Sequence, residues 1–142
     1  MVHHVYILRS ASKPMKMYVG YSTNPTRRLE EHNGKGSKGA IATRKHRPWR
    51  IIAIVSGFST LNDAYRLEHC LQHRKEFRKV DKCLALLRSL SLERWTQSSA
   101  LTSETLPNLV ITWSQTDRKA LAAFEQLRTS PIMIKELTIS EF

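Results

Sequence analysis

Three short segments in the first half of the chain carry the apolar patterns of β-strands. Residues 3–9 and 18–21 combine aromatic and β-branched side chains, which suit a pleated surface. Residues 50–58, RIIAIVSGF, form a nearly continuous apolar run, which is typical of a strand buried on both faces. The pattern therefore predicts three strands, with the third in the centre of the sheet.

A helix is predicted over residues 25–33 by its capping residues. Asn24 is suited to the N-cap, Pro25 to the first helical position, and Gly34 to the position just after the last turn. The following residues, 34–48, contain three glycines and five Lys or Arg residues, so we expect a loop there.

A longer helix begins after Ser59 or Thr60 and is predicted to reach about Phe77, because apolar residues recur there at helical spacing. The later elements are predicted to be a helix over 81–90 that continues through residue 95, a linker over 97–107, a strand over 108–113, a helix over 117–128 and a strand-like segment over 132–139.

Together these elements predict an α/β (α+β) fold built on a small mixed three-stranded sheet that is flanked by helices. We expect residues 1–80 to form one domain and residues 81–142 to form a C-terminal helix–strand extension. The extension is expected to pack against the first domain or to form a dimer contact, because its helices carry more apolar surface than a solvated helix should expose.

The positive charge is concentrated in one part of the chain. Residues 1–82 contain 17 of the 23 Lys and Arg residues, 6 of the 12 acidic residues and all six histidines. The whole net charge of +11 lies there, and residues 83–142 are neutral. This asymmetry favours a polyanion such as nucleic acid as the partner. A membrane is disfavoured because the sequence has neither a basic amphipathic helix with an aromatic face nor a run of 18 apolar residues.

Cysteine content and the N-terminal residues bear on the compartment. Only two cysteines are present, Cys70 and Cys83, and both fall in predicted helices rather than in a disulfide framework. The N-terminus lacks the basic and long apolar regions of a secretory signal. We therefore expect an intracellular location, in the nucleus or cytoplasm.

Four residues of the basic part could contribute to one site. Tyr6 and Tyr18 lie on neighbouring predicted strands, and Arg28 and His32 project from one face of a helix because one turn separates them. A plainer explanation stays open for each of them. The tyrosines could be core residues, and the helix could be a solvated, salt-bridged surface.

Glu68 would lie on the apolar side of the longer helix, where a carboxylate is costly unless it is paired or binds a metal ion. The plainer explanation is a partner at the helix rim, either Arg66 or Arg74. The basic part of the chain has no pair of acidic residues on its strands. A single cation at Glu68 is therefore expected rather than a two-metal centre.

Several ordered motifs over residues 3–75 resemble those of the GIY-YIG nuclease superfamily. These are VYI at 5–7, YVG at 18–20, the Arg28-x-x-x-His32-Asn33 helix and Glu68. The RPW at 47–49, the SGF at 56–58 and the RLEHCLQH at 66–73 are similar to the catalytic subunit of the eukaryotic Slx-type structure-specific endonuclease. The resemblance implies a metal-dependent DNA endonuclease that cuts flaps, forks and Holliday junctions in recombination or repair.

The resemblance and the residue types together imply the catalytic roles. Tyr6 is expected to act as general base, with its pKa lowered by a neighbouring cation or by a base such as Tyr18 or His32. Arg28 is expected to bind the scissile phosphate through its guanidinium fork. Glu68 is expected to hold one divalent cation, Mg²⁺ or Mn²⁺. The predicted catalytic residues are therefore Tyr6, Tyr18, Arg28, His32 and Glu68.

The basic loop is expected to line the DNA, and Gly20 should allow a close backbone approach. The predicted DNA-binding residues are Gly20, Arg27, Asn33, Lys35, Lys38, Arg44, Lys45 and Arg47. Contacts of this kind position the DNA backbone without reading bases, which suits recognition of branch shape.

The chain departs from the family pattern at two places. His4 replaces the glycine of the first motif. Residues 83–142 contain a single cysteine and cannot be the zinc-binding RING-like domain, so dependence on a scaffold subunit is not predicted, and a homodimer is an alternative. A sequence-specific restriction or homing nuclease and a non-catalytic nucleic-acid-binding module are the other functions that the sequence leaves open.

Overall fold

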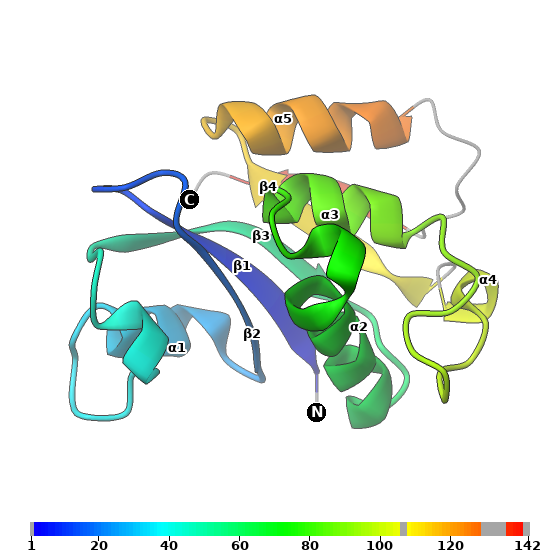
Figure 1. The fold of residues 1–142 in the computed structure, drawn as a ribbon, viewed down its shortest axis with the longest axis horizontal. Coiled ribbons are helices and arrows are strands. Elements are labelled where there is room, and N and C mark those ends of the chain that lie inside the picture. The colour runs from blue at the N-terminus through cyan, green and yellow to red at the C-terminus, as the bar shows by residue number, and fades with distance from the viewer. Residues whose placement is uncertain (1, 106–107, 129–135, 141–142) are drawn as a thin grey trace.

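The strands that apolar patterning predicts pair into a single mixed sheet. The computed structural model describes residues 2–105, 108–128 and 136–140. The strands are β1 (His4–Ser10), β2 (Met17–Ser22), β3 (Trp49–Ser56), β4 (Val110–Ser114) and β5 (Glu136–Ser140). Their order across the sheet is β2-β1-β3-β4-β5 (Figure 1). All neighbouring pairs are antiparallel except β4 and β5, which run parallel.

The predicted fold class is confirmed, but the sheet is wider than three strands. As expected, β3 is the central strand, and it pairs with β1 along one side and with β4 along the other. Residues 110–114 join the sheet because an apolar strand such as β3 has two hydrogen-bonding edges, and β1 satisfies only one of them. Whether residues 1–80 and 81–142 can fold separately stays a prediction.

The helices over residues 25–32 and 61–73 begin at the expected caps. The helices of the structure are α1 (Pro25–His32), α2 (Leu61–His73), α3 (Lys82–Ser89), α4 (Thr102–Thr105) and α5 (Arg118–Phe124). Side chains of Asn24, Thr60, Asp81 and Asp117 accept hydrogen bonds from the first turns of α1, α2, α3 and α5. The predicted linker over 97–107 contains the short helix α4.

Helices α2 and α3 end earlier than predicted. Helix α2 stops at His73, because Arg74 is extended, and a 3₁₀ turn at Lys75–Phe77 then places Phe77 in the core. Helix α3 stops at Ser89 instead of continuing through Trp95. The buried Trp95 folds back and donates its indole N–H to the Ser89 carbonyl over 3.2 Å, which satisfies one of the free carbonyls at the helix end.

The last two predicted elements differ only in detail. Helix α5 is shorter than the predicted 117–128 and is continued by a 3₁₀ turn at Glu125–Arg128. Of the predicted segment 132–139, residues 136–139 form most of β5, and residues 132–135 lie outside the described residues. No helix in the described part of the chain is long and apolar enough to cross a membrane.

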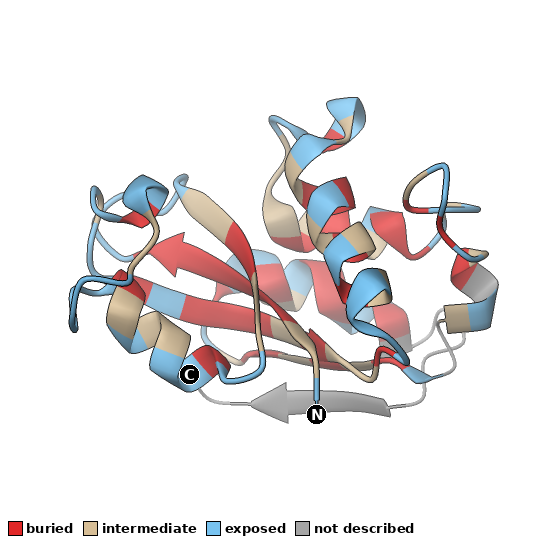
Figure 2. Cartoon of the chain, turned by 90° about the horizontal axis from the view of Figure 1, so that it is seen from below, coloured by how far each residue is buried: buried red, intermediate tan, exposed pale blue. Residues whose placement is uncertain are grey.

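The two faces of the sheet have different coverings, as Figures 1 and 2 show. Helices α2, α3 and α5 pack on the face that carries Val5 and Ile7, and they form the main core with it. Helix α1 lies on the other face, where a smaller cluster contains Tyr6, Leu8 and Trp49. Because side chains alternate along β1, the strand is buried on both faces and presents Tyr6 on the α1 side.

Candidate active site

Tyr6 and His32 are joined by a buried hydrogen bond on the α1 side of the sheet. The Tyr6 hydroxyl lies 2.7 Å from His32 Nε2, and the two residues are 1% and 0% exposed. The Tyr18 ring, on the neighbouring strand β2, has its centroid 4.9 Å from that of His32 and 6.5 Å from that of Tyr6. The structure thus brings together three of the five predicted catalytic residues as a contiguous cluster.

Thr43 determines which nitrogen of His32 carries the proton. His32 Nδ1 lies 2.8 Å from Thr43 Oγ1, and the Thr43 hydroxyl donates its own proton to the Ala40 carbonyl over 2.8 Å. Thr43 must therefore accept from His32 Nδ1–H, which leaves the Nε2 lone pair directed at the Tyr6 hydroxyl.

The surroundings of His32 keep its imidazole neutral. Burial lowers the pKa of His32 to about 4, with the positive charges of Arg28 and Arg47 acting in the same direction and Glu31 acting against them. At neutral pH the ring is therefore uncharged and can accept a proton from Tyr6.

The sequence predicts a lowered pKa for Tyr6, but burial in the protein has the opposite effect. It raises the pKa of the Tyr6 phenol, the neighbouring Tyr18 and Glu68 raise it further, and only Arg28 lowers it. Within the protein alone Tyr6 is therefore a protonated phenol. The hydrogen bond to His32 offers the route by which it can lose that proton.

Gly20 makes room for Tyr6. The two residues are partners across β1 and β2, and a Cβ at position 20 would overlap the Tyr6 hydroxyl and ring. The structure thus supports a packing role for this glycine at the site, rather than the direct approach to DNA that was expected.

Arg28 lies at the open side of the cluster. It is partly exposed, it donates to the Lys38 carbonyl, and its Nη1 lies 3.7 Å from Glu31 Oε2. Its charge acts on the pKa of Tyr6, Tyr18 and His32. A guanidinium in this position is available to a phosphate that approaches Tyr6.

Glu68 is placed beside the cluster by the packing of α2 along the edge strand β2. One turn further along α2, the Gln72 side chain donates to the Val19 carbonyl over 2.6 Å. The Glu68 charge raises the pKa of Tyr6 and Tyr18, and burial raises the pKa of Glu68 itself.

The plainer explanation for Glu68, an arginine partner, is not seen. Arg66 pairs with Asp63 at 3.4 Å and Arg74 pairs with Glu76 at 2.8 Å. Glu68 therefore forms no ion pair within the described residues.

The donor set at Glu68 fits a weakly held magnesium ion. Among the described residues, no group of three or more His, Cys, Asp or Glu side chains could enclose a metal ion. Mg²⁺ commonly keeps several waters and binds one or two carboxylates together with substrate phosphates. A half-buried carboxylate that forms no ion pair with the described residues matches that type of site.

The predicted DNA-binding residues fall into two groups. Arg27, Lys35, Lys38, Arg44, Lys45 and Arg47 are exposed on α1 and the following loop. Of these, Lys35 pairs with Glu30 at 3.0 Å, and Arg47 donates to the His32 carbonyl over 2.8 Å.

Asn33 differs from these cations, because both polar atoms of its side chain form hydrogen bonds within the protein. Its amide accepts from the Trp49 N–H over 2.6 Å and donates to the Trp49 carbonyl over 3.0 Å. This pair of hydrogen bonds attaches the end of α1 to the start of β3.

Sequence reasoning missed Thr43 and Gln72. Thr43 lies in a 3₁₀ turn at Ile41–Thr43, within a segment whose glycines and charges predict only a loop. The turn is held in place by the buried Trp49, whose indole N–H donates to the Thr43 carbonyl over 2.8 Å. No local sequence pattern marks either residue, because both act on partners that are distant in the chain.

Comparison with known proteins identifies the family to which the first part of the chain is similar. The family model described as the GIY-YIG catalytic domain matches residues 2–81. The structure-specific endonuclease subunit SLX1 of Debaryomyces hansenii is 44% identical over 79 residues, which are 54% of this chain and 23% of that protein. The proteins of the same name from Meyerozyma guilliermondii and Ajellomyces capsulatus are 45% and 43% identical over 78 and 82 residues. Those matches cover 54% and 55% of this chain, but 26% and 20% of the two relatives. The matched region is thus between a fifth and about a quarter of each relative.

Proposed function

Because the chain belongs to the family of GIY-YIG catalytic domains, we propose that it is a DNA endonuclease that hydrolyses phosphodiester bonds in branched DNA. The observation that carries this proposal is the buried chain of hydrogen bonds from Tyr6 through His32 to Thr43, with Arg28 and Glu68 beside it. A phenol directed at a neutral imidazole is suited to removing a proton from an attacking water.

In the proposed mechanism Tyr6 passes its proton to His32 Nε2 and takes a proton from the attacking water. The water oxygen then bonds to phosphorus, the bond from phosphorus to the 3′ oxygen breaks, and the leaving oxygen takes a proton from solvent. Arg28 binds the phosphate and stabilises the charge that develops on it. Glu68 would hold one divalent cation, Mg²⁺ or Mn²⁺. When bound, such a cation would supply positive charge that stabilises the developing negative charge.

A preference for branched substrates is proposed from two observations. The matched relatives are named structure-specific endonuclease subunits. The exposed cations of the loop after α1 are suited to contacts with the DNA backbone rather than with base edges. A role in DNA recombination or repair follows if the chain cuts forks, flaps or four-way junctions.

The partners are also proposals. The relatives are named subunits, so a partner protein is one expectation, and a homodimer is another because a four-way junction needs two symmetric cuts. A nuclear or cytoplasmic location at replicating DNA stays a prediction.

Cleavage of labelled flap, fork, four-way junction and linear duplexes of shared sequence, with and without Mg²⁺, tests the function. We expect the branched substrates to be cut in the presence of the cation, and Tyr6→Phe to abolish cutting. Tyr21→Phe is the matched control, because Tyr21 lies on the other face of β2 and bonds His3 at 2.7 Å. Equal loss in both variants would contradict the assignment, and efficient cutting of linear DNA at one sequence would favour a sequence-specific nuclease.

Two further variants separate the roles of the site residues. Glu68→Gln should abolish cleavage while leaving junction binding nearly intact. Arg28→Ala should lower turnover more than affinity, since its interaction strengthens as charge develops on the phosphate. A pure loss of affinity in Arg28→Ala would make Arg28 a docking residue only.

A further inference from the structure

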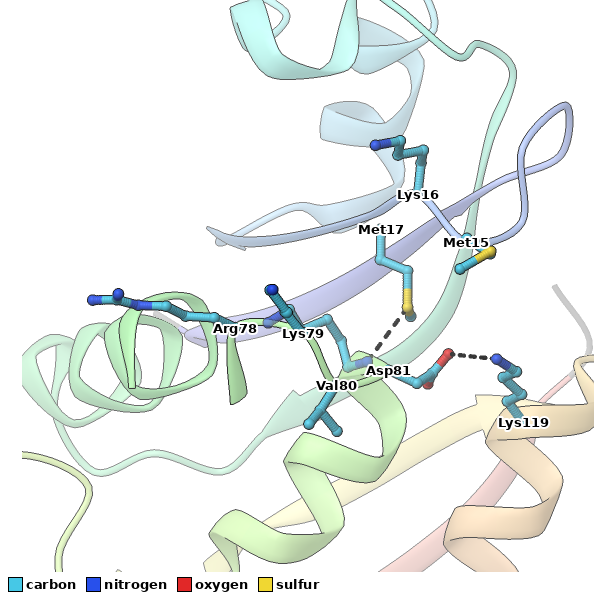
Figure 3. Close-up of a pocket in the computed structure, with 9 residues that line it drawn as sticks. Met15, Lys16, Met17, Arg78, Lys79, Val80, Asp81 and Lys119 are labelled. Atoms are coloured by element: carbon cyan, nitrogen blue, oxygen red, sulfur yellow. Dashed lines mark hydrogen bonds and ion pairs between the residues drawn. The ribbon is translucent and has the colours of Figure 1, made fainter. Parts of the chain in front are cut away.

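A second basic surface lies at a hollow that the proposed active site does not use. The hollow, of about 420 Å³, is formed where the β1–β2 loop, the segment before α3 and the start of α5 meet (Figure 3). Its charged lining residues are Lys16, Arg78, Lys79, Lys82, Lys119 and Asp81. The hollow is therefore lined by five cationic side chains and one acidic side chain, which come from three segments far apart in the sequence.

Most of this positive charge is not neutralised within the protein. Asp81 Oδ2 already lies 2.9 Å from the buried Arg9, with Lys119 at 4.0 Å. Lys16, Arg78 and Lys79 are exposed and form no ion pair within the described residues.

Lys82 is different from the other cations of the hollow. Its Nζ donates to the carbonyls of Leu71 and Phe77, both over 2.8 Å, so it holds the turn before α3 in place. It contributes charge to the hollow without being free to reach outward.

The β1–β2 loop, which forms one side of the hollow, lies next to the end of the basic loop that follows α1. The β1–β2 loop is attached to the start of β3, because Ala11 N–H donates to the Pro48 carbonyl over 2.9 Å and Ser10 Oγ donates to the His46 carbonyl over 2.6 Å. Burial and the charges of Lys13, Lys16 and Lys45 together lower the pKa of His46. Positive charge therefore extends from Lys45, in the loop near the catalytic cluster, to Lys16 at the rim of the hollow.

We propose that this hollow binds the sugar–phosphate backbone of a second duplex arm of a branched DNA whose first arm lies at the Tyr6 site. The inference rests on the proposed function and adds to it a surface that can distinguish a branch from a linear duplex. Exposed Lys and Arg heads contact phosphates regardless of sequence, so a site of this kind recognises where an arm lies and not which bases it contains.

Lysine footprinting of the full chain tests the proposal, because the two surfaces carry different lysines. Acetylation by an amine-reactive reagent is followed by mass spectrometry for the free protein, with a four-way junction and with a short linear duplex. The junction should protect Lys16, Lys79 and Lys119 as well as Lys38 and Lys45, and the duplex should protect only the last two. Exposed Lys75, which does not line the hollow, is the reference.

The outcomes separate the two proposals. Protection by the junction at Lys38 and Lys45 alone would overturn the second-arm site and leave the proposed function intact. Protection at the hollow alone would overturn the proposed active site, and with it the assignment of the hollow to a second arm, because no first arm would then lie at Tyr6. If the short duplex protected the hollow as strongly as the junction does, one duplex would span both surfaces, and the second-arm site would be overturned. If no lysine were protected, both the second-arm site and the proposed function would be overturned.

A pair of charge variants gives a second readout that does not depend on footprinting. Lys16→Gln/Lys79→Gln should weaken junction binding by about tenfold and reduce the salt slope of log K by about 2, because each lost phosphate contact removes about 0.9. Linear duplex binding and single-turnover cleavage at saturation should be unchanged. Arg88→Gln/Arg94→Gln removes the same charge from exposed positions outside the hollow. An equal effect of both variants on junction binding would contradict the proposal.

Discussion

At the scale of single residues, Thr43 gives direction to the hydrogen bonds of the site. It donates to Ala40 and so can only accept from His32, and this leaves His32 Nε2 as an acceptor for Tyr6. A buried threonine hydroxyl thus selects the histidine tautomer that the proposed general base catalysis by Tyr6 would require.

Replacing Thr43 with valine should therefore lower the rate of cleavage without lowering DNA affinity. The side chain keeps its shape and loses the acceptor of His32 Nδ1–H, so we expect a loss of about tenfold in the single-turnover rate, less than the loss of a general base itself. Thr43→Ser should restore the rate, because it restores the hydroxyl. An unchanged rate in Thr43→Val would show that the tautomer is determined by other contacts.

His32 should also make the protein sensitive to acid. Its pKa is about 4 in the folded protein and near 6.5 in an unfolded chain, so the unfolded state binds more protons between these values. The free energy of unfolding therefore rises with pH through this window, and the contribution is complete above about pH 6.5. As the pH falls from about 6.5 to about 4, we expect a loss on the order of 3 kcal/mol.

Urea denaturation across this pH range measures the effect. His32→Gln should flatten the dependence, whereas replacing the exposed His69 should leave it as in the parent chain. A parent chain whose stability is constant over the window would contradict the assignment of a neutral, buried His32.

At the scale of elements, α1 and α2 hold the proposed catalytic side chains through contacts with strand backbones. Asn33 binds both backbone groups of Trp49 at the start of β3, and Gln72 binds the Val19 carbonyl on β2. Each helix is thereby anchored next to the functional residue that it carries, His32 on α1 and Glu68 on α2. Anchoring of this kind keeps both side chains at fixed positions relative to the sheet.

The role of Asn33 can be separated into anchoring and DNA binding. Asn33→Ala would leave Trp49 N–H and C=O without these partners, so we expect a loss of about 1–3 kcal/mol in the free energy of unfolding. If anchoring is its role, DNA affinity measured well below the melting temperature should stay within about twofold. Asn62→Ala, at an exposed position on α2, is the control. A large loss of affinity with little loss of stability would instead support the DNA contact predicted from sequence.

At the scale of the whole molecule, Arg9 connects β1 to helices α3 and α5. Its Nε lies 2.6 Å from Asp117 and its Nη2 lies 2.9 Å from Asp81, and these two acids are also the N-caps of α5 and α3. One buried guanidinium thus joins the first strand to elements that follow residue 80. It also neutralises the carboxylate in the basic hollow.

Replacing Arg9 with methionine should destabilise the whole fold. The change would leave two poorly exposed carboxylates without their cation, and breaking a buried ion pair in this way costs about 3–5 kcal/mol. Chemical denaturation measures the loss, with Arg50→Met as control. Arg50 is the exposed partner of Arg9 across β1 and β3 and should cost less than about 0.5 kcal/mol. Equal effects of the two variants would show that the ion cluster contributes little.

The amino-acid sequence by itself determined the local structure and the chemical types at the site. Caps at Asn24 and Thr60 define where helices begin, and apolar runs define the strands, because these rules act between residues close in the chain. The order of the motifs over residues 3–75 was enough to predict the family. The separation of charge at residue 82 was enough to predict a polyanionic partner.

Only the tertiary structure decided how these residues act together. The bonds from Tyr6 to His32, from Gln72 to Val19 and from Arg9 to Asp117 join residues 26, 53 and 108 positions apart. No propensity or periodicity encodes such contacts, because they depend on which faces and edges meet after the sheet has formed. For the same reason the tautomer of His32, the pairing of β4 with β3 and the basic hollow between three distant segments emerge only in the folded chain.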